Sequence, residues 1–435
     1  MAEVRPFQGV HYNQELLKHW EDVICPVYDI ISPQQQIELH KRNDNNFVRL
    51  EFGLELPQDT ERDNKYTRAA ATLEEWLKQG VMLADKSPAI YLHDHYFTHG
   101  GKEHKRRGLI VRVRVEEWDK MIIRPHEGTM TKPKADRLNL LGTLQANTSS
   151  ILGLYQDSGR QIASLLAVEG QKEPFLNLRK AGGEGHRIWA VTDSTVVGQI
   201  QKHLAEQPLY IADGHHRYES ALVYQRQRLA ASSSSSREEG FNFVMMTLLD
   251  FADPGMILPP HRLVRGIGKE TLDELMPKLK VFFDIEDIPL NAPDVWEQVD
   301  RRLGKTDGVR LALCGLEAGR VFLLKLRDQA AVNSMMPHFH SEIYKSLDVS
   351  VLDHVILEKF LGLGENKEGQ FVGFTYDRQD AINRVLAREY QLAFIIRPIK
   401  AETIKAIADV RDRMPKKSTY FYPKPPSGLI INRLI

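Results

Sequence analysis

The spacing of apolar and polar residues along the chain predicts a mixture of helices and strands. Between residues 109 and 115 apolar side chains alternate with arginines, which is typical of a half-buried strand. Residues 89–97 provide a partner strand across the turn Gly100–Gly101. A helical repeat of apolar residues predicts a helix from 66 to 78, and Ser32 before Pro33 marks the start of another.

The rest of the first half also mixes helices and strands, whereas in the second half short predicted helices and strands alternate. Helices are predicted at 194–205 and from about 215 to 229, strands at 209–212 and 242–251, and irregular structure over 120–150. After about residue 266 the predicted helices are 269–279, 293–303, 350–361, 379–389 and 401–413, and the strands are 280–286, 309–314, 320–326 and 391–397. We predict an α/β (α+β) fold with two domains, 1–265 and 266–435.

Composition narrows the class of protein. The chain has 435 residues, which is more than one domain of ordinary size, and its 58 basic residues balance 58 acidic ones. Zero net charge argues against nucleic-acid and membrane-surface partners. Two distant cysteines, Cys25 and Cys314, fit a reducing compartment. With no secretory signal and no apolar stretch of about 20 residues, we expect a cytoplasmic protein; a homodimer is compatible with the sequence.

Several common catalytic motifs are absent from the sequence. It contains no GxxxxGK[ST] motif, no GxGxxG after a strand, no HExxH and no GxSxG. Any phosphate or nucleotide site must therefore be built in another way.

The stretch Asp213-Gly-His-His-Arg217 is the most informative part of the sequence. It follows an apolar strand and starts a helix, so the first N–H groups of that helix lie at the end of the strand. Gly214 lets an anion approach the backbone, and His215, His216 and Arg217 add donors for phosphate oxygens. Asp213 lies where it can orient a hydroxyl or hold Mg²⁺. The alternatives are a capped helix with buried histidines and a zinc site.

A second group of polar residues occupies 124–147. Glu127 follows His126 among cationic residues, which suits a phosphoryl-transfer centre where a carboxylate takes the acceptor's proton and His126 assists. Asn147 is a candidate substrate ligand. The alternative is a solvated loop with weak ion pairs. The candidate clamp for the leaving phosphate is Lys132, Lys134 and Arg137.

Weaker candidates lie elsewhere in the chain. Tyr28 and Asp29 are placed to contact substrate or to cap a helix, and Arg262 to add an anion contact. A basic tail could return to the site and bind phosphate; its candidate residues are Lys416, Lys417, Ser418, Thr419 and Lys424. The pairs His93/His95 and His338/His340 are each predicted to share a strand face, as core or surface histidines rather than metal ligands.

These stretches together resemble a known family. The blocks CPVYDIIS (25–32), PHEGTMTKPKADR (125–137), LYIADGHHRYESAL (209–222), FVMMTLLDFADPGMILPPHRLV (243–264) and MPKKSTYFYPKPPSGLIIN (414–432) are similar to the domain of unknown function 1015 family. The Asp213–Arg217 turn is similar to that of the ParB/sulfiredoxin-like superfamily, in which such a loop holds nucleotide phosphates. Within it, free-serine kinases pair a PHE loop, whose glutamate acts as base, with a DGHHR loop.

The resemblance implies a ParB/sulfiredoxin-like phosphate-binding domain in residues 1–265 and a phosphotransferase activity. The expected donor is pyrophosphate or a nucleotide, the expected acceptor free L-serine or another small hydroxyl compound, with Mg²⁺ and no organic cofactor. Glu127 would then be the base, and Gly214 to Arg217 would bind the donor. Two rivals remain: a nucleotide-binding switch without catalysis, and a metal-dependent phosphohydrolase using His126, Asp213, His215 and His216.

Overall fold

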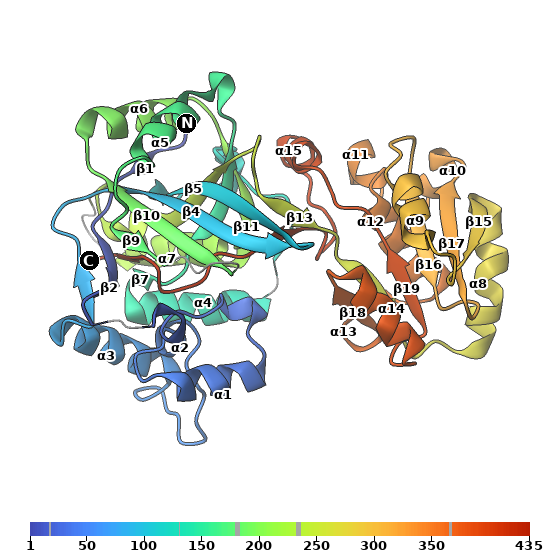
Figure 1. The fold of residues 1–435 in the computed structure, drawn as a ribbon, viewed down its shortest axis with the longest axis horizontal. Helices are drawn as coiled ribbons and strands as arrows, with labels where there is room; N and C mark the ends of the chain where they lie inside the picture. Colours follow the sequence, from blue (N-terminus) through green and yellow to red (C-terminus); the bar gives the residue numbers. More distant parts are fainter. Residues whose placement is uncertain (17–18, 130, 179–182, 232–235, 365–367) are drawn as a thin grey trace. The chain divides into compact units, whose positions relative to one another are not determined.

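The chain forms a mixed α/β protein of two compact units (Figure 1). The computed structural model describes residues 1–435 except 17–18, 130, 179–182, 232–235 and 365–367, and leaves out the side chains of residues 131, 132 and 368. The first unit comprises residues 1–125, 129–256 and 423–435, and the second comprises 126–128 and 257–422. Among the described helices, none is both long enough and apolar enough to span a membrane.

A nine-stranded sheet organises the first unit, in the order β6-β11-β8-β12-β5-β4-β10-β9 with β1 added beside β5. The predicted hairpin is confirmed, because Gly100 and Gly101 both take the positive φ that a tight hairpin turn needs. The bounds are β1 (Val4–Arg5), β4 (Ile90–His99), β5 (Lys102–Arg114), β6 (Ile123–Arg124), β8 (Ile151–Tyr155), β9 (Leu176–Asn177), β10 (Gly185–Val191), β11 (Leu209–Asp213) and β12 (Phe243–Asp250).

The two faces of this sheet are covered differently. Apolar residues of α5 (Gln161–Glu169), α6 (Ser194–Ala205) and α7 (His215–Ala231) pack in one core with β4, β5 and β12. Leu429 and Ile430 from the end of the chain pack in a separate core with Tyr91, Ile110 and Ile188. Strand β5 is therefore covered on both faces rather than half-buried as predicted, and even Arg114 is buried against Glu3.

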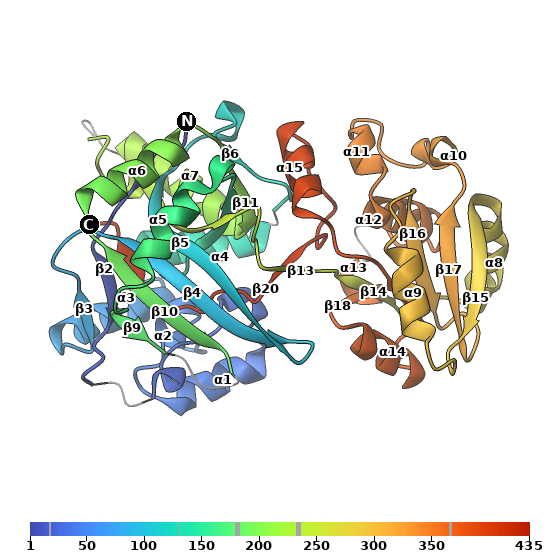
Figure 2. The ribbon, with the colours of Figure 1, turned by 45° about the horizontal axis from the view of Figure 1, so that its top comes forward.

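A smaller four-stranded sheet, β3-β2-β21-β7, completes the first unit with the remaining helices. In Figures 1 and 2, α1 to α3 lie on the opposite side of this unit from α5 and α6. Ser32 caps α1 through Gln35 N, as predicted. The bounds are β2 (Gly9–Tyr12), β3 (Met82–Ala84), β7 (Ala146–Asn147), β21 (Ile431–Arg433), α1 (Pro33–Arg42), α2 (Val48–Glu51), α3 (Lys65–Lys78) and α4 (Thr131–Leu144).

The prediction of irregular structure over 120–150 is wrong, because α4 fills half of that segment. Its leucines serve two different cores: Leu141 packs with the large sheet, whereas Leu140 and Leu144 pack with α1 to α3. A helix buried on two sides has no single apolar stripe, so the repeat that normally identifies a helix is weak.

The second unit contains a six-stranded antiparallel sheet, β15-β17-β16-β19-β14-β18. Most predicted elements are present, with shifted ends. The strands are β14 (His261–Val264), β15 (Phe283–Pro289), β16 (Arg310–Cys314), β17 (Arg320–Leu326), β18 (Val372–Thr375) and β19 (Leu392–Ile395); β13 (Met256–Leu258) and β20 (Tyr420–Tyr422) form a separate pair. The helical segments are α8 (Lys269–Phe282), α9 (Val295–Leu303), α10 (Gln329–Asn333), α11 (Glu342–Lys345), α12 (Asp348–Ser350), the π-helical η6 (Val351–Phe360), α13 (Glu368–Phe371), α14 (Arg378–Leu386) and α15 (Ala401–Asp409).

The division between the units differs from the predicted one at 265/266. It falls between residues 256 and 257, because β14 pairs with β18 and β19 in the second sheet. Residues 423–435 return to the first unit, where β21 pairs with β2 and β7.

Candidate functional site

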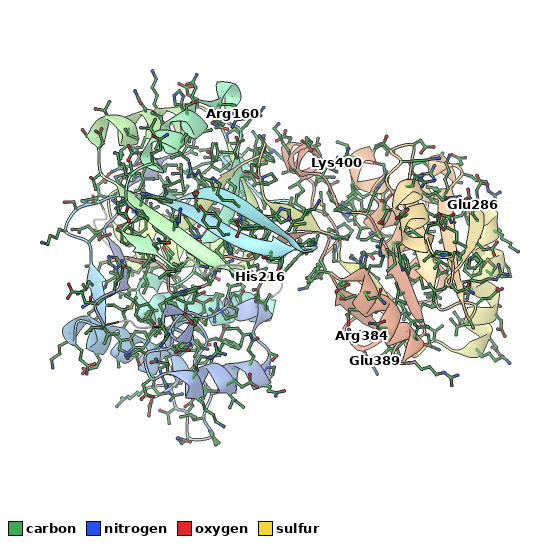
Figure 3. All side chains as sticks on the ribbon, in the orientation of Figure 1. Arg160, His216, Glu286, Arg384, Glu389 and Lys400 are labelled. Carbon is green, nitrogen blue, oxygen red and sulfur yellow. The ribbon has the colours of Figure 1, made fainter. Side chains whose placement is uncertain are left out.

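The site in the first unit is built on the turn between β11 and α7. Asp213 ends the strand, Gly214 has φ +94°, and His215 begins the helix. Glycine is favoured at position 214 by its positive φ, and a Cβ there would lie 2.9 Å from Nη2 of Arg217, so the guanidinium would have to shift. His215 is buried, and His216, labelled in Figure 3, is half-buried. The predicted strand–glycine–helix arrangement is present.

Arg217 is held in place at the start of α7. Its Nη2 donates to Asp213 Oδ2 at 2.7 Å and its Nη1 donates to the Ser150 carbonyl at 2.6 Å. A guanidinium fixed by two bonds loses little further freedom when it binds an anion. Arg217 is therefore positioned beside Gly214 before any ligand arrives.

Lys424 places a second cation on Asp213. Its Nζ lies 2.7 Å from Asp213 Oδ1 and also pairs with Asp29 Oδ2. Burial alone would raise the pKa of Asp213, but Lys424 and Arg217 together hold it well below its usual range. The same two carboxylates keep the pKa of Lys424 above its usual value against the effect of burial. Asp213 is thus an anion shared by two cations.

Tyr28 and Arg137 lie in the same cluster. The Arg137 guanidinium carbon is 3.9 Å from the centroid of the Tyr28 ring, and burial raises the pKa of Tyr28 to about 12. Arg137 also donates to the Glu51 carbonyl and pairs with Asp136. Arg137 and Arg217 line one cavity of about 40 Å³. That volume holds a few water molecules, so a nucleotide must bind outside it.

Of the predicted site residues between 124 and 147, two form contacts within the fold, and the side chain of a third is not among those that the structure describes. Asn147 Oδ1 accepts from Met245 N and from Asn432 Nδ2, which ties β7 to its neighbours. Lys134 Nζ lies 3.4 Å from Glu219 Oε2 on α7. The side chain of Lys132 lies outside the described residues.

His126 and Glu127 belong to the second unit, with the segment 414–419. Glu127 Oε1 accepts from Lys417 N at 2.8 Å, and Met414 N donates to the His126 carbonyl at 2.7 Å. His126 is fully buried, with Nε2 3.0 Å from Thr419 Oγ1. Two motifs almost 300 positions apart in the sequence therefore form one local structure in this unit.

Arg262 organises the same segment from within the fold. It is 1% exposed and forms a two-bond ion pair with Asp353. It also donates to the carbonyls of Pro260, Lys416 and Lys417. Arg262 was predicted to contact an anion, but these partners use its donors, and it instead fixes the backbone that holds Glu127. Ser418, predicted to bind phosphate, is buried and donates to the Pro415 carbonyl.

The structure gathers Tyr28, Asp29, Arg137, Asp213 and Arg217 in the first unit, and His126, Glu127, Lys417 and Thr419 in the second. The sequence did not identify Glu51 or Ser150 as parts of the first group. Glu51 is fully buried within the segment Phe47 to Phe52, and an acidic residue among Phe47, Val48, Leu50 and Phe52 is the pattern that could have found it.

Comparison with known proteins places the chain in a family. Residues 4–350 match the family described as "Protein of unknown function (DUF1015)". The chain belongs to this family. A search of curated proteins gave no match.

Several solved structures are similar to this DUF1015 member at low identity. A free serine kinase in complex with AMP is 13% identical, with 72% of this chain and 86% of that chain covered and a TM-score of 0.35. SbnI from Staphylococcus aureus, truncated at its C-terminus, is 10% identical, with coverages of 74% and 87% and a TM-score of 0.36. A conserved hypothetical protein from Pyrococcus furiosus is 12% identical, with coverages of 75% and 95% and a TM-score of 0.35.

Proposed function

We propose that the protein is a phosphotransferase that moves a phosphoryl group from pyrophosphate or a nucleotide to a small hydroxyl acceptor. Free L-serine is the first acceptor to test, because the PHE and DGHHR motifs resemble those of free-serine kinases. The observation that carries the proposal is the turn at Gly214, which places the first backbone N–H groups of α7 beside a fixed Arg217.

In phosphoryl transfer the protein contributes mainly by positioning the donor and the acceptor and by neutralising the phosphate charge. In the proposed site the first N–H groups of α7, with His215, His216 and Arg217, bind the donor phosphates. Asp213 and Asp29 already share one ammonium group, that of Lys424, and a pair of carboxylates around a cation is the donor set that suits Mg²⁺. When bound with the donor, Mg²⁺ would neutralise phosphate charge, held by Asp213 and Asp29 in place of the Lys424 ammonium group.

Glu127 is proposed as the base that takes the proton of the acceptor hydroxyl. The Lys417 amide fixes one carboxylate oxygen of Glu127, which orients the group without neutralising it. Arg262 donates to the carbonyls of Lys416 and Lys417 on either side of this amide, so the backbone that orients Glu127 would be held rigidly.

The deciding experiment incubates the protein with L-serine, Mg²⁺ and, in turn, pyrophosphate, ATP, ADP or CTP, and follows phosphoserine by phosphorus NMR. We expect phosphoserine with at least one donor. Ligand-dependent thermal stabilisation without product would favour the nucleotide-binding switch. Release of phosphate without an acceptor, stopped by chelators, would favour the phosphohydrolase.

The Glu127→Gln variant tests the base. We expect kcat to fall by about 100-fold or more while donor affinity is unchanged, because the amide keeps the size of the side chain but cannot accept a proton. Glu402→Gln is the matched control, since Glu402 is an exposed glutamate on α15 of the same unit. Loss of donor binding with preserved turnover in the Glu127 variant would refute the assignment.

A further inference from the structure

Three histidines and a glutamate meet on one face of the large sheet in the first unit. His93 and His95 belong to β4, His186 belongs to β10, and Glu184 immediately precedes β10; we call these four residues the histidine cluster. His95 and His186 are directly opposite each other in the antiparallel pairing, and their ring centroids are 4.4 Å apart. All three histidines are at most 3% exposed.

Three ligand-type atoms in the cluster converge on one point. His95 Nε2 is 2.7 Å from Glu184 Oε1, and His186 Nε2 is 3.9 Å from the same oxygen. One ligand atom from each of these three residues lies within 4.8 Å of the others. Ligand atoms around a tetrahedral zinc ion are about 3.3 Å apart, given bonds of about 2.0–2.1 Å. Small side-chain shifts would therefore bring the three atoms to coordination distance.

The two ring nitrogens of His186 have different surroundings. Its Nε2 has no hydrogen-bond partner among the described residues, although the residue is fully buried. Its other ring nitrogen, Nδ1, lies 3.0 Å from His93 Nε2. A proton on Nδ1 of His186, shared with His93, leaves a lone pair on Nε2, and metal-bound histidines are oriented by an outer partner in this way.

The histidine cluster is buried except at its glutamate. Glu184 has 52% of its side chain exposed, so the cluster has a route to solvent. An unpaired buried nitrogen carries a free-energy penalty that coordination would remove.

We propose that His95, His186 and Glu184 form a binding site for a divalent transition-metal ion of the zinc type, with His93 as the outer partner of His186. Two imidazoles and one carboxylate suit Zn²⁺ and its neighbours in the first transition row, whereas Mg²⁺ and Ca²⁺ prefer oxygen ligands alone. The sequence had favoured core histidines here. This site does not depend on the proposed phosphotransferase activity.

Arg106 sets the main cost of metal binding. Its Nη2 lies 3.3 Å from His95 Nδ1 and 2.7 Å from the Pro423 carbonyl. The proton shared between His95 Nε2 and Glu184 must leave that nitrogen, since only an unprotonated nitrogen coordinates. If it moves to Nδ1, Arg106 loses the longer contact but keeps its carbonyl partner.

The test measures Zn²⁺ binding by the whole 435-residue chain after chelator treatment. We expect a single Zn²⁺ per chain by equilibrium dialysis, a higher melting temperature with Zn²⁺, and visible absorption bands of a four-coordinate site with Co²⁺. Mg²⁺ should not compete. His186→Gln should weaken Zn²⁺ binding by at least about 100-fold, and His93→Gln by about 10- to 100-fold.

Two further variants keep the test decisive. Glu184→Gln retains the size of a half-exposed side chain, so it should fold normally and still weaken Zn²⁺ binding. His203→Gln, on α6 outside the cluster, should bind Zn²⁺ like the wild type. Circular dichroism without metal establishes that each variant is folded. The proposal is overturned if the wild type binds no Zn²⁺, or if Glu184→Gln and His186→Gln bind it as the wild type does.

Discussion

Lys424 neutralises two carboxylates that the fold brings together in the first unit, Asp213 and Asp29. The Lys424 side chain is 8% exposed, so solvent screens the interaction little. Removing it would leave Asp213 with one ion pair among the described residues, the pair with Arg217. We expect Lys424→Met to lower the free energy of unfolding by about 2–3 kcal/mol at pH 7, less than a fully buried pair because both carboxylates are partly exposed.

The stability difference between the wild type and Lys424→Met should depend on pH. The folded pKa of Asp213 lies below its unfolded value of about 3.9, so its stabilisation is complete above that pH and is lost as the pH falls further. The difference between wild type and Lys424→Met in urea unfolding should therefore be constant near neutrality and shrink below about pH 4. Lys120→Met, which removes an exposed partner of Glu116, is the control and should change stability little. Equal effects of both substitutions would contradict the assignment.

At the scale of secondary-structure elements, the sequence predicts most accurately the features that depend on residues adjacent in the chain. The turn from β11 to α7 was predicted because an apolar strand, a glycine and a helix start are adjacent in the chain. Helix α4 was missed because its leucines pack into two cores made from distant segments. The pairing of His126 and Glu127 with residues 414–419 also depends on long-range folding, so the sequence could suggest a returning tail but not its contacts.

Gly214→Ala tests whether the turn itself makes the donor site. A left-handed backbone costs a residue with a side chain about 1–2 kcal/mol, and the new Cβ would push the Arg217 guanidinium away from Asp213. We expect donor binding, measured by calorimetry, to weaken by more than about tenfold, which corresponds to the loss of about one charged hydrogen bond.

Gly198→Ala provides the matched control for the turn. Gly198 lies inside α6, and a Cβ there meets nothing within 4 Å. The substitution should stabilise the protein by about 0.5–1 kcal/mol and leave donor binding unchanged. If Gly214→Ala bound the donor as tightly as Gly198→Ala, the turn would not be the phosphate site.

At the scale of the whole molecule, neither compact unit is one continuous stretch of the chain. The change of rhythm near residue 266 indicated a second unit, but β14 joins that unit before the change, and residues 423–435 leave it again. A boundary based on local composition assumes that each domain is continuous in sequence. Here the first unit is assembled from three segments, and contacts distant in sequence, such as the pairing of β21 with β2 and β7, reveal the last of them.

The assembly of the first unit from three segments predicts which strands lose stability when a residue of β21 is replaced. Ile431 on β21 is fully buried in the core of the first unit, so Ile431→Ala should lower the free energy of unfolding by about 2–5 kcal/mol. Hydrogen exchange followed by mass spectrometry should show faster exchange in β2 and β7, which flank β21, and unchanged exchange in β15 to β17 of the second unit. Ile395→Ala, on β19 in the core of the second unit, is the matched control and should give the reverse pattern. Faster exchange in β15 to β17 but not in β2 and β7 after Ile431→Ala would mean that the end of the chain stabilises the second unit, against the division described above.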